Sequence, residues 1–386
     1  MASYDNTLVF RVTWYDRQAD LTKDLILSYH RADNSVELYD PKLRRLFLKR
    51  TPAAVPLEDQ LYVGNTVVVV SRQLKIVDYA DERTHSALAP RLQKAVVVLK
   101  PHAHEHMGNV LQRLLDDGLT LSVIQMVELA PHQANAFLDL LEDNSSSEHD
   151  KNSDTRQQVV QSLSNGRCIV MAILGNEASS RLGYIVGPAD PAEAKLQAPE
   201  SLRAAYGTST TNNAILWKEL NDSQLLLVRK FLSGATLSPP ELGTDCSCCV
   251  IKPSSLHDAG KIIKQIRDSG FRITALQSFH LSRNAAEEFY EVYKTVLHEL
   301  PQMIDELAQG ICIAMQVEHK DKQSVPRLRE LAGPYDSEMA RFVRPHSLRA
   351  LFGSDRVRNA IHCTDLEDDA VLEVQYFFSV LANTVN

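Results

Sequence analysis

The chain contains 386 residues, of which 44% are hydrophobic and 23% are charged. This composition is typical of a folded protein with two or three domains, and it excludes disorder over most of the chain. The formal net charge of -8, from 41 basic and 49 acidic residues, argues against general nucleic-acid binding, and no apolar run reaches the roughly 18 residues of a membrane span. We therefore expect neither nucleic acid nor a membrane as a partner. Six cysteines in so long a chain do not suggest a disulfide framework, so we expect a reducing compartment.

Residues 1 to 92 predict a small β-sheet or β-barrel domain. The apolar run at 8–12 and the β-branched run at 66–70 are typical of strands. Turn signals at 32–35 and 40–41 lie between them. Because no long helical period occurs in this part, we predict a β-rich domain.

An internal repeat fills the rest of the chain. Residues 95–101 correspond to the segment that ends at 253, with an offset of 152, and Gly108 recurs as Gly260 at the same offset. Further along, residues 201–207 correspond to 347–353, and the offset falls to 146. The first copy therefore has six more residues, which we place in the polar segment 143–150.

Each copy predicts strands alternating with helices. In the second copy we expect strands that end at Lys252 and that cover 271–278 and 311–317. A first helix buries three isoleucines, and a longer second helix has apolar residues at helical spacing from Phe289 to Leu297. This order predicts the α/β (α+β) class, one sheet with helices packed on it. The linker is predicted at 237–245, so the domains are 1–92, 93–236 and 246–386.

The two copies differ at one chemically important position. The second copy reads Asn359-Ala360-Ile361-His362, whereas the first copy reads Asn213-Ala214-Ile215-Leu216. Neither copy contains a Walker-type glycine loop or a dinucleotide fingerprint, so nucleotide binding cannot be argued from those motifs.

The repeated unit resembles the nucleoside diphosphate kinase family. The resemblance rests on four marks: Lys252-Pro253, Gly333-Pro334-Tyr335-Asp336, the segment 347–353 and Asn359-Ala360-Ile361-His362. It covers both copies and implies two ferredoxin-like βαββαβ domains. In the first 92 residues, the segments 13–16, 47–50, 61–66 and 71–79 resemble the DM-ten domain of ciliary proteins, which implies a small PH-like β domain.

The resemblance implies a phosphotransferase site in the second copy. His362 is implied as the nucleophile that carries the γ-phosphoryl group, and Glu373 as the group that holds its other ring nitrogen. A neutral imidazole is a competent nucleophile near pH 7. The implied nucleotide-binding and supporting residues are Lys252, Arg329 and Arg349 at the phosphates, Asn359 at the sugar, Tyr290 near the histidine, and Thr364 and Asp365 in its loop. The implied cofactor is Mg²⁺ bound with the nucleoside triphosphate, with no metal site of the protein's own.

Both copies depart from the family pattern. In the second copy, residues 295–300 lack the aromatic side chain on which the family stacks the base. Tyr335 replaces a threonine, and Cys363 replaces a glycine. In the first copy, Leu216, Gly183 and Leu227 replace the nucleophile, an arginine and the glutamate, so we expect no activity there. Lys100, Arg203 and Asn213 remain, which leaves weak anion binding open.

Three other clusters have simple interpretations. His102, His104 and His106 alternate and could meet a metal from one face of an extended segment, but no partner cluster accompanies them. Cys246, Cys248 and Cys249 lack a second cysteine pair at zinc spacing. The basic run of Lys42, Arg44, Arg45, Lys49 and Arg50 predicts a solvated hairpin, with contact to an acidic partner such as tubulin as the alternative.

Two functions follow from these observations. The resemblance implies a structural protein of the ciliary or flagellar axoneme, bound to doublet microtubules as a microtubule inner protein, with tubulin and other axonemal proteins as partners. The expected location is then the cytoplasm, in the cytoskeleton of a cilium or flagellum. The alternative is an active nucleoside diphosphate kinase that works through His362, with nucleotide as its ligand.

Overall fold

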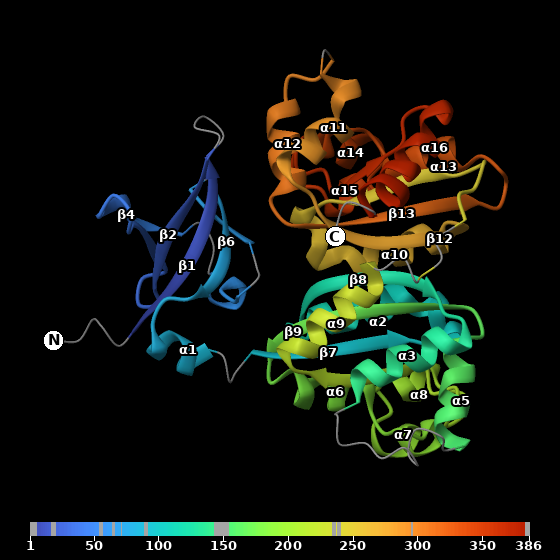
Figure 1. Cartoon of the computed structure of the whole chain (residues 1–386). Helices are drawn as coiled ribbons and strands as arrows, with labels where there is room; N and C mark the ends of the chain where they lie inside the picture. Colours follow the sequence, from blue (N-terminus) through green and yellow to red (C-terminus); the bar gives the residue numbers. More distant parts are fainter. Residues whose placement is uncertain are drawn as a thin grey trace. The chain divides into compact units, whose positions relative to one another are not determined.

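The computed structural model describes residues 6–16, 21–53, 57–63, 66–70, 72–88, 92–142, 154–233, 237, 241–294 and 296–382. The chain divides into two compact units, Met1–Leu92 and Gln93–Asn386 (Figure 1). The predicted loop at 143–150 and residues 238–240 of the predicted linker lie outside the described residues, as do Gly64, Asn65 and Ser71 of the DM-ten-like segments. In the described part of the chain, no helix is long and apolar enough to cross a bilayer.

The first unit is a six-stranded antiparallel sheet in the order β4-β3-β2-β1-β6-β5. Its elements are β1 (Thr7–Asp16), β2 (Leu21–His30), β3 (Ser35–Asp40), β4 (Arg45–Pro52), η2 (Glu58–Gln60), β5 (Thr66–Val69), β6 (Arg72–Tyr79) and α1 (Glu82–Leu88). In β2, every second residue from Leu25 to Tyr29 is buried, because alternate side chains of a strand point to the same face. These side chains form the core of the unit together with Phe10 and Ile76. The β-rich character predicted for this part is confirmed, and the PH-like detail stays a prediction.

The second unit holds both copies of the repeat in one eight-stranded sheet, in the order β10-β7-β9-β8-β12-β13-β11-β14. The first copy contains β7 (Leu92–Leu99), η3 (Pro101–His106), α2 (Met107–Asp116), β8 (Thr120–Glu128), α3 (Pro131–Leu141), α5 (Asp154–Leu163), β9 (Arg167–Asn176), α6 (Ala178–Val186), α7 (Pro191–Gln197), α8 (Leu202–Tyr206), β10 (Ile215–Leu220) and α9 (Asp222–Ser233). The second copy contains β11 (Ser247–Ile251), η4 (Pro253–Asp258), α10 (Ala259–Asp268), β12 (Phe271–His280), α11 (Arg283–Phe289), η5 (Glu291–Tyr293), α12 (Leu300–Ala308), β13 (Ile311–His319), α13 (Ser324–Ala332), α14 (Ser337–Val343), α15 (Leu348–Phe352), β14 (Ile361–Cys363), α16 (Glu367–Gln375) and η6 (Tyr376–Leu381). Both copies follow the βαββαβ order with additional helices between the second and third strands, α3 and α5 in the first copy and α11 and α12 in the second, and the predicted fold class is confirmed.

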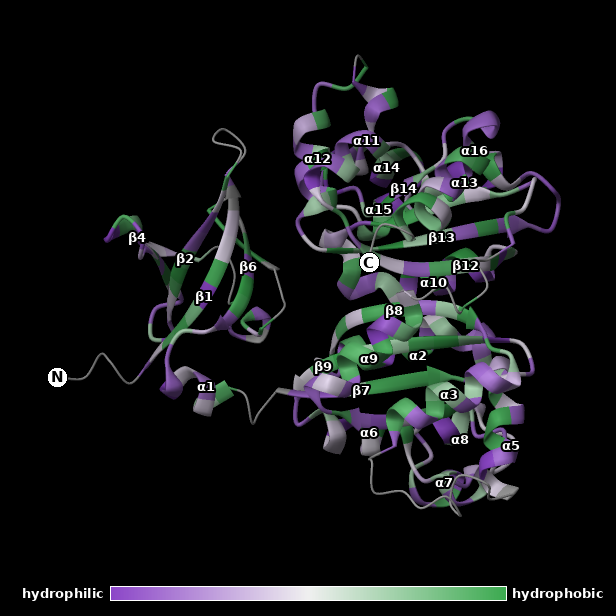
Figure 2. Ribbon diagram, in the orientation of Figure 1, coloured by the Kyte–Doolittle hydropathy of each residue, from purple (hydrophilic) through white to green (hydrophobic). Residues whose placement is uncertain are grey.

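Helices cover both faces of this sheet over β9 and β13, which are buried along nearly their whole length, whereas β8 and β12 in the middle of the sheet keep half-buried residues. In β9 every residue from Cys168 to Gly175 is buried, and Figure 2 shows long hydrophobic stretches in β7, β8 and β13. The core under α2 and α10 is shared by both copies, whereas the opposite face has a separate cluster in each copy. Such continuous apolar runs are typical of strands with two covered faces.

The two copies meet about an approximate twofold axis. Gln125 of β8 pairs with Gln277 of β12, and these residues are equivalent positions of the repeat at the offset of 152. On one face of the sheet, α2 packs against α10 with Gly108 and Gly260 in contact. A Cβ atom on Gly260 would lie 2.4 Å from both the carbonyl oxygen of Gly108 and the amide nitrogen of Gln112. Glycine at both positions therefore permits the close approach of the two helix backbones.

One predicted element of the second copy is wrong. The expected longer helix with its apolar face from Phe289 to Leu297 ends at Phe289, and among the described residues up to Leu297 only the short turn η5 follows. Phe289 and Tyr290 are buried, but Val292 and Val296 are 67% and 69% exposed, so the apolar period does not mark one buried face. The strands β12 and β13 are each two residues longer than predicted.

Candidate active site

His362 lies on β14, a three-residue strand at the edge of the sheet, where it pairs with Val250 of β11. Its Nε2 atom is 3.0 Å from Oε2 of Glu373, which projects from α16. The hydroxyl of Thr364 donates to the same carboxylate oxygen at 2.8 Å. The His362 and Glu373 side chains are only 7% and 14% exposed. Because Glu373 accepts only when Nε2 carries a proton, the arrangement leaves Nδ1 with a free lone pair.

Aromatic rings surround the imidazole on one side. The ring centroid of Phe289 is 4.8 Å from that of His362, and those of Tyr290 and Tyr293 are at 6.0 and 6.4 Å. Tyr290 is fully buried, and its hydroxyl has no hydrogen-bond partner among the described residues. Burial raises the pKa of this hydroxyl well above its ordinary value, so it remains a proton donor. An unpartnered donor beside the histidine suits an anionic ligand.

A cavity of about 650 Å³ opens next to His362. All five predicted nucleotide-binding residues line it: Lys252, Tyr290, Arg329, Arg349 and Asn359. Glu373 is not part of the lining, because it lies behind the imidazole ring, bonded to Nε2. The structure thus brings together residues that follow β11 and α11, lie in α13 and α15, and precede β14.

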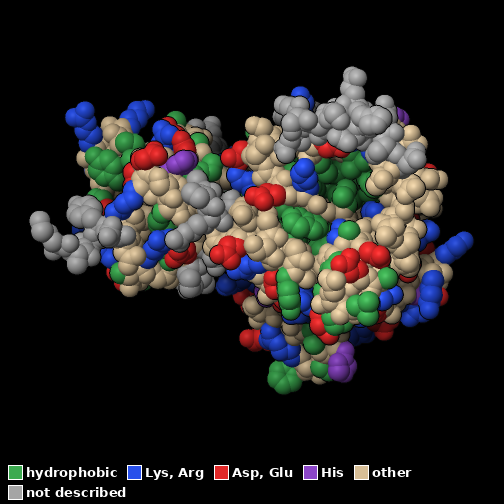
Figure 3. Space-filling model, turned by 90° about the horizontal axis from the view of Figure 1, so that it is seen from below, with side chains coloured by type: hydrophobic (Ala, Val, Ile, Leu, Met, Phe, Trp, Pro, Cys, Tyr) green, Lys and Arg blue, Asp and Glu red, His purple; other side chains and the backbone are tan. Residues whose placement is uncertain are grey.

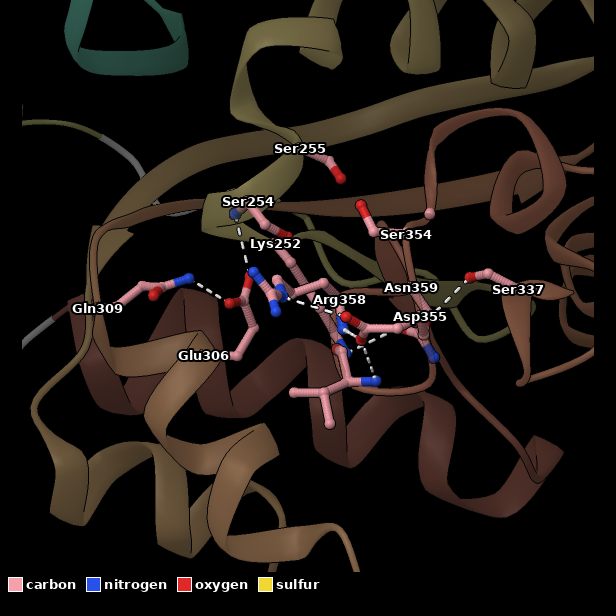
Figure 4. A network of polar contacts seen from close by, with 12 residues as sticks. Lys252, Ser254, Ser255, Glu306, Gln309, Ser337, Ser354, Asp355, Arg358 and Asn359 are labelled. Carbon is pink, nitrogen blue, oxygen red and sulfur yellow. Dashed lines mark hydrogen bonds and ion pairs between the residues drawn. The ribbon is translucent and has the colours of Figure 1, made fainter. Parts of the chain in front are cut away.

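Lys252 projects from the end of β11 into a polar network (Figure 4). Its Nζ atom donates to Oδ1 of Asn359 at 2.7 Å and to the carbonyl of Val357 at 2.9 Å. The side-chain amide of Asn359 in turn donates to the carbonyl of Tyr335 at 3.0 Å. Burial, assisted by the charge of Arg349, lowers the pKa of Lys252 to about 7. A bound phosphate would stabilise the charged form of this amine.

The two arginines differ in how firmly they are held. Arg349 donates to the carbonyls of Gly333 at 3.0 Å and Ile361 at 3.4 Å, and its Nε atom is buried without a hydrogen-bond partner among the described residues. Arg329 is half-exposed, and its Nη1 donates to the carbonyl of Asp365 at 2.8 Å. Arg349 is thus held in place by hydrogen bonds in the wall of the cavity, whereas Arg329 lies at the rim of the cavity.

The departures from the family pattern lie in the same cavity. The hydroxyl of Tyr335 contacts the sulfur of Met303 at 3.0 Å, and the Arg349 guanidinium lies 6.0 Å from the centre of the Tyr335 ring. Val296 and Leu297 line the side where the family has an aromatic base-stacking residue. On that side the cavity therefore offers aliphatic rather than aromatic contacts to a base.

Sequence reasoning missed one residue of the site. The hydroxyl of Tyr293 donates to Oδ2 of Asp365 at 2.6 Å, and so links η5 to the loop after His362. Asp365 also accepts from Arg329 through its backbone carbonyl. The available signal was the hydroxyl of a tyrosine among apolar residues at helical spacing, but that spacing predicted a core position instead.

The first copy keeps the polar framework but not the reactive groups. Arg203 donates to the carbonyls of Gly187 and Ile215, which are the counterparts of Gly333 and Ile361. Lys100 donates to the carbonyl of Thr211, the counterpart of Val357, and burial lowers its pKa to about 8. At the position of His362, however, β10 carries Leu216. The framework bonds therefore serve the fold in both copies.

The hypothesis of a metal site at the three histidines assumed an extended segment, which is wrong. His102, His104 and His106 lie in the helical turn η3 rather than in an extended segment, so they do not alternate on one face. Within the described residues, no group of three or more His, Cys, Asp or Glu side chains could hold a metal ion. Cys246, Cys248 and Cys249 are buried free thiols.

The chain is similar in sequence to known proteins. The sequence model of the family "Nucleoside diphosphate kinase" matches residues 93–222 and 245–382. The chain is 37% identical to nucleoside diphosphate kinase homolog 7 of Rattus norvegicus over 97% of this chain and 93% of that protein, and equally similar to the Mus musculus protein. It is 36% identical to the nucleoside diphosphate kinase of Aquifex aeolicus over 34% of this chain and 92% of that protein. A crystal structure of the Aquifex aeolicus enzyme matches 36% of this chain and 96% of its own, with 34% identity and a TM-score of 0.33.

Proposed function

The chain belongs to the nucleoside diphosphate kinase family, and on this premise we propose that its second copy transfers a γ-phosphoryl group from a nucleoside triphosphate to a nucleoside diphosphate through phosphohistidine at His362. The observation that carries the proposal is the pair of His362 and Glu373 at a cavity lined by Lys252, Arg329 and Arg349. The first copy supplies half of a shared body and takes no part in the chemistry, because Leu216 cannot accept a phosphoryl group.

In the first half-reaction, Nδ1 of His362 attacks the γ-phosphorus. The nitrogen–phosphorus bond forms, the bond to the bridging oxygen breaks, and the nucleoside diphosphate leaves with the electron pair. Glu373 stabilises the positive charge that develops on the ring through its contact with Nε2. A second nucleoside diphosphate then takes the phosphoryl group by the reverse steps, which gives ping-pong kinetics.

The cationic side chains neutralise the charge of the phosphates. Arg349 and Lys252 lie in the wall of the cavity, and Arg329 at its rim can close over a bound nucleotide. The Mg²⁺ ion enters with the triphosphate as part of the substrate and adds charge neutralisation at the phosphates. The unpartnered hydroxyl of Tyr290 provides a further donor beside the transferred group.

The test is phosphoryl transfer by the full chain. We expect labelled ATP with Mg²⁺ to produce an acid-labile phosphoprotein, and added GDP to remove the label as GTP. His362→Ala should abolish the label, whereas His257→Ala, at a histidine with a 72% exposed side chain, should not change it. Absence of label at millimolar ATP would refute the proposal.

We propose a structural role as the second candidate, in which the chain binds doublet microtubules of a ciliary or flagellar axoneme. A surface feature of the first unit favours it. Lys42, Arg44, Arg45 and Lys49 are exposed on the β3–β4 hairpin and have no ion-pair partner among the described residues. Two exposed leucines, Leu43 and Leu46, accompany them, and Lys and Arg side chains protrude from this end of the unit in Figure 3. We define these six residues as the basic hairpin.

An acidic surface such as that of tubulin is the complementary partner for the basic hairpin. The full chain should pellet with microtubules, and binding should weaken as the salt concentration rises. A variant with Lys42, Arg44, Arg45 and Lys49 changed to glutamine should lose most of this binding. Equal pelleting of this variant, or a diffuse cytosolic signal of the tagged chain in ciliated cells, would count against the structural role.

A further inference from the structure

Two free thiols face each other beside the candidate nucleophile. Cys249 of β11 lies directly opposite Cys363 of β14 in an antiparallel pair. The backbone bonds on either side join Lys252 to Ala360 and Thr364 to Cys248. Because bonded and non-bonded positions alternate along such a pair, Cys249 and Cys363 occupy a non-hydrogen-bonded position, where Cα atoms are about 4.5 Å apart. A disulfide bond requires Cα atoms roughly 4.4–6.8 Å apart, so the spacing suits one.

The two thiols are both buried but differ in their access to the cavity. Cys363 directly follows His362 and lines the cavity, and its sulfur lies 3.7 Å from Nη2 of Arg349. Both thiols belong to the core shared by the two copies, but Cys249 does not line the cavity. Since β14 is a three-residue strand at the sheet edge, few backbone bonds hold it against local opening. Cys363 is therefore the thiol that an oxidant reaches first, and Cys249 is the thiol behind it.

The first copy supplies an internal comparison. At the equivalent positions Val97 pairs with Trp217, so the pairing of the strands is the same but no thiol is present. The facing cysteines occur only in the copy that carries the histidine. The pair is thus not required by the architecture of the sheet.

We propose that Cys249 and Cys363 form a reversible oxidation site that blocks phosphoryl transfer at His362. The sulfur of Cys363 adds to one nitrogen of a two-electron thiol oxidant such as a diazenedicarboxamide, and the thiol hydrogen goes to the other nitrogen. The Cys249 sulfur then attacks that of Cys363, the sulfur–sulfur bond forms as the sulfur–nitrogen bond breaks, and the oxidant leaves as the hydrazine that carries the hydrogens of both thiols. A dithiol reverses the reaction by thiol–disulfide exchange.

The disulfide bond acts on the cavity by moving Cys363. Its sulfur leaves the contact with Arg349, and the adjacent His362 is tied to β11 by a covalent link. Small displacements of reacting groups have large effects on rate, so we expect histidine labelling to fall about tenfold or more. This second half of the proposal rests on the proposed function, whereas formation of the disulfide bond does not.

The experiment treats the full chain with diamide for several hours, because burial raises the pKa of the Cys363 thiol and slows its reaction. Free thiols are then alkylated, and peptides are mapped by mass spectrometry. We expect one linkage, between Cys249 and Cys363, that dithiothreitol removes. Cys249→Ala should prevent it, and Cys312→Ala, at a buried thiol on the opposite face of the sheet, should leave it unchanged.

The outcomes separate the two proposals. If both thiols remain fully alkylated, or if Cys363 links to another cysteine, the oxidation site is refuted whether or not the protein phosphorylates itself. If the disulfide bond forms but labelling from ATP stays at the level of the reduced chain, the regulatory part is refuted. If the reduced chain takes no label while the linkage forms, the proposed enzyme function fails and the oxidation site stands. Loss of label on oxidation and its return with dithiothreitol, both absent in Cys249→Ala, would support the full proposal.

Discussion

Replacing Glu373 by glutamine tests the arrangement around the candidate nucleophile. The carboxylate accepts from Nε2 of His362 at 3.0 Å, and neither side chain is more than 14% exposed, so water screens this contact only weakly. A hydrogen bond to a charged group contributes about 1.5–3 kcal/mol. Because phosphorylation at Nδ1 places positive charge on the ring, this contribution is larger in the transition state than in the free protein. At about 1.4 kcal/mol for each tenfold change, Glu373→Gln should slow labelling of His362 by about 10- to 150-fold.

The assay is the initial rate of acid-labile labelling from ATP, measured on rapidly quenched full-length chain. Glu367→Gln is the matched control, because it makes the same chemical change at an exposed position in the first turn of the same helix. Thermal unfolding of both variants should confirm that the fold is intact. A Glu373→Gln chain that labels within twofold of the unmodified rate would refute the role of this carboxylate.

Three further outcomes are expected. Between about pH 7 and 10 the unfolded chain binds more protons at Lys252 than the folded chain does, because the folded pKa of this amine is about 7. The contribution of Lys252 to the unfolding free energy therefore rises with pH. In urea titrations at pH 7 and pH 9, the unfolding free energy of Lys252→Met should increase less with pH than that of the unmodified chain. Gly260→Ala should lower the unfolding free energy by about 1–3 kcal/mol through overpacking against α2. Gly183→Ala is the control and should be neutral or stabilising, because a Cβ atom there meets nothing within 4 Å. Equal stability of the two variants would contradict the close contact of α2 and α10. Leu216→His should not make the first copy take up label in a His362→Ala background, because a histidine there has no glutamate behind it; label in this double variant would show that the framework alone suffices.

Much of the fold was predictable because the same pattern of strands and helices occurs in both copies of the repeat. The alternation of strands and helices in residues 93–236 recurs in residues 246–386, and in both copies additional helices stand between the second and third strands of the βαββαβ order. The helix predicted beyond Phe289 was wrong for a physical reason. Apolar residues at helical spacing indicate a buried face only if a partner covers them, and Val292 and Val296 face solvent.

The residues of the site could be named from the motif, but not their contacts. The resemblance to the nucleoside diphosphate kinase family implies the pair of His362 and Glu373, and the structure places Nε2 and Oε2 3.0 Å apart. The depressed pKa of Lys252 comes from complete burial at the end of β11, which a strand pattern does not reveal. The link from Tyr293 to Asp365 joins segments 72 residues apart, so it depends on the tertiary fold.

The approximate twofold arrangement also needed the structure. The sequence supplies the offset of 152, but it does not say that equivalent positions meet. The pairing of Gln125 with Gln277 and the contact of Gly108 with Gly260 show that they do. A body of this kind can retain an inactive half, because that half supplies strands and core to the shared sheet.

The central claim is that only the second copy carries a phosphoryl group, and that it does so on His362. The most direct measurement is mass spectrometry, under alkaline conditions that preserve phosphohistidine, of the full chain after incubation with ATP and Mg²⁺. The account predicts one phosphate, on the peptide that contains His362, and none on peptides from residues 93–236. A phosphate on any other residue, or an unmodified His362 peptide at millimolar ATP, would contradict it.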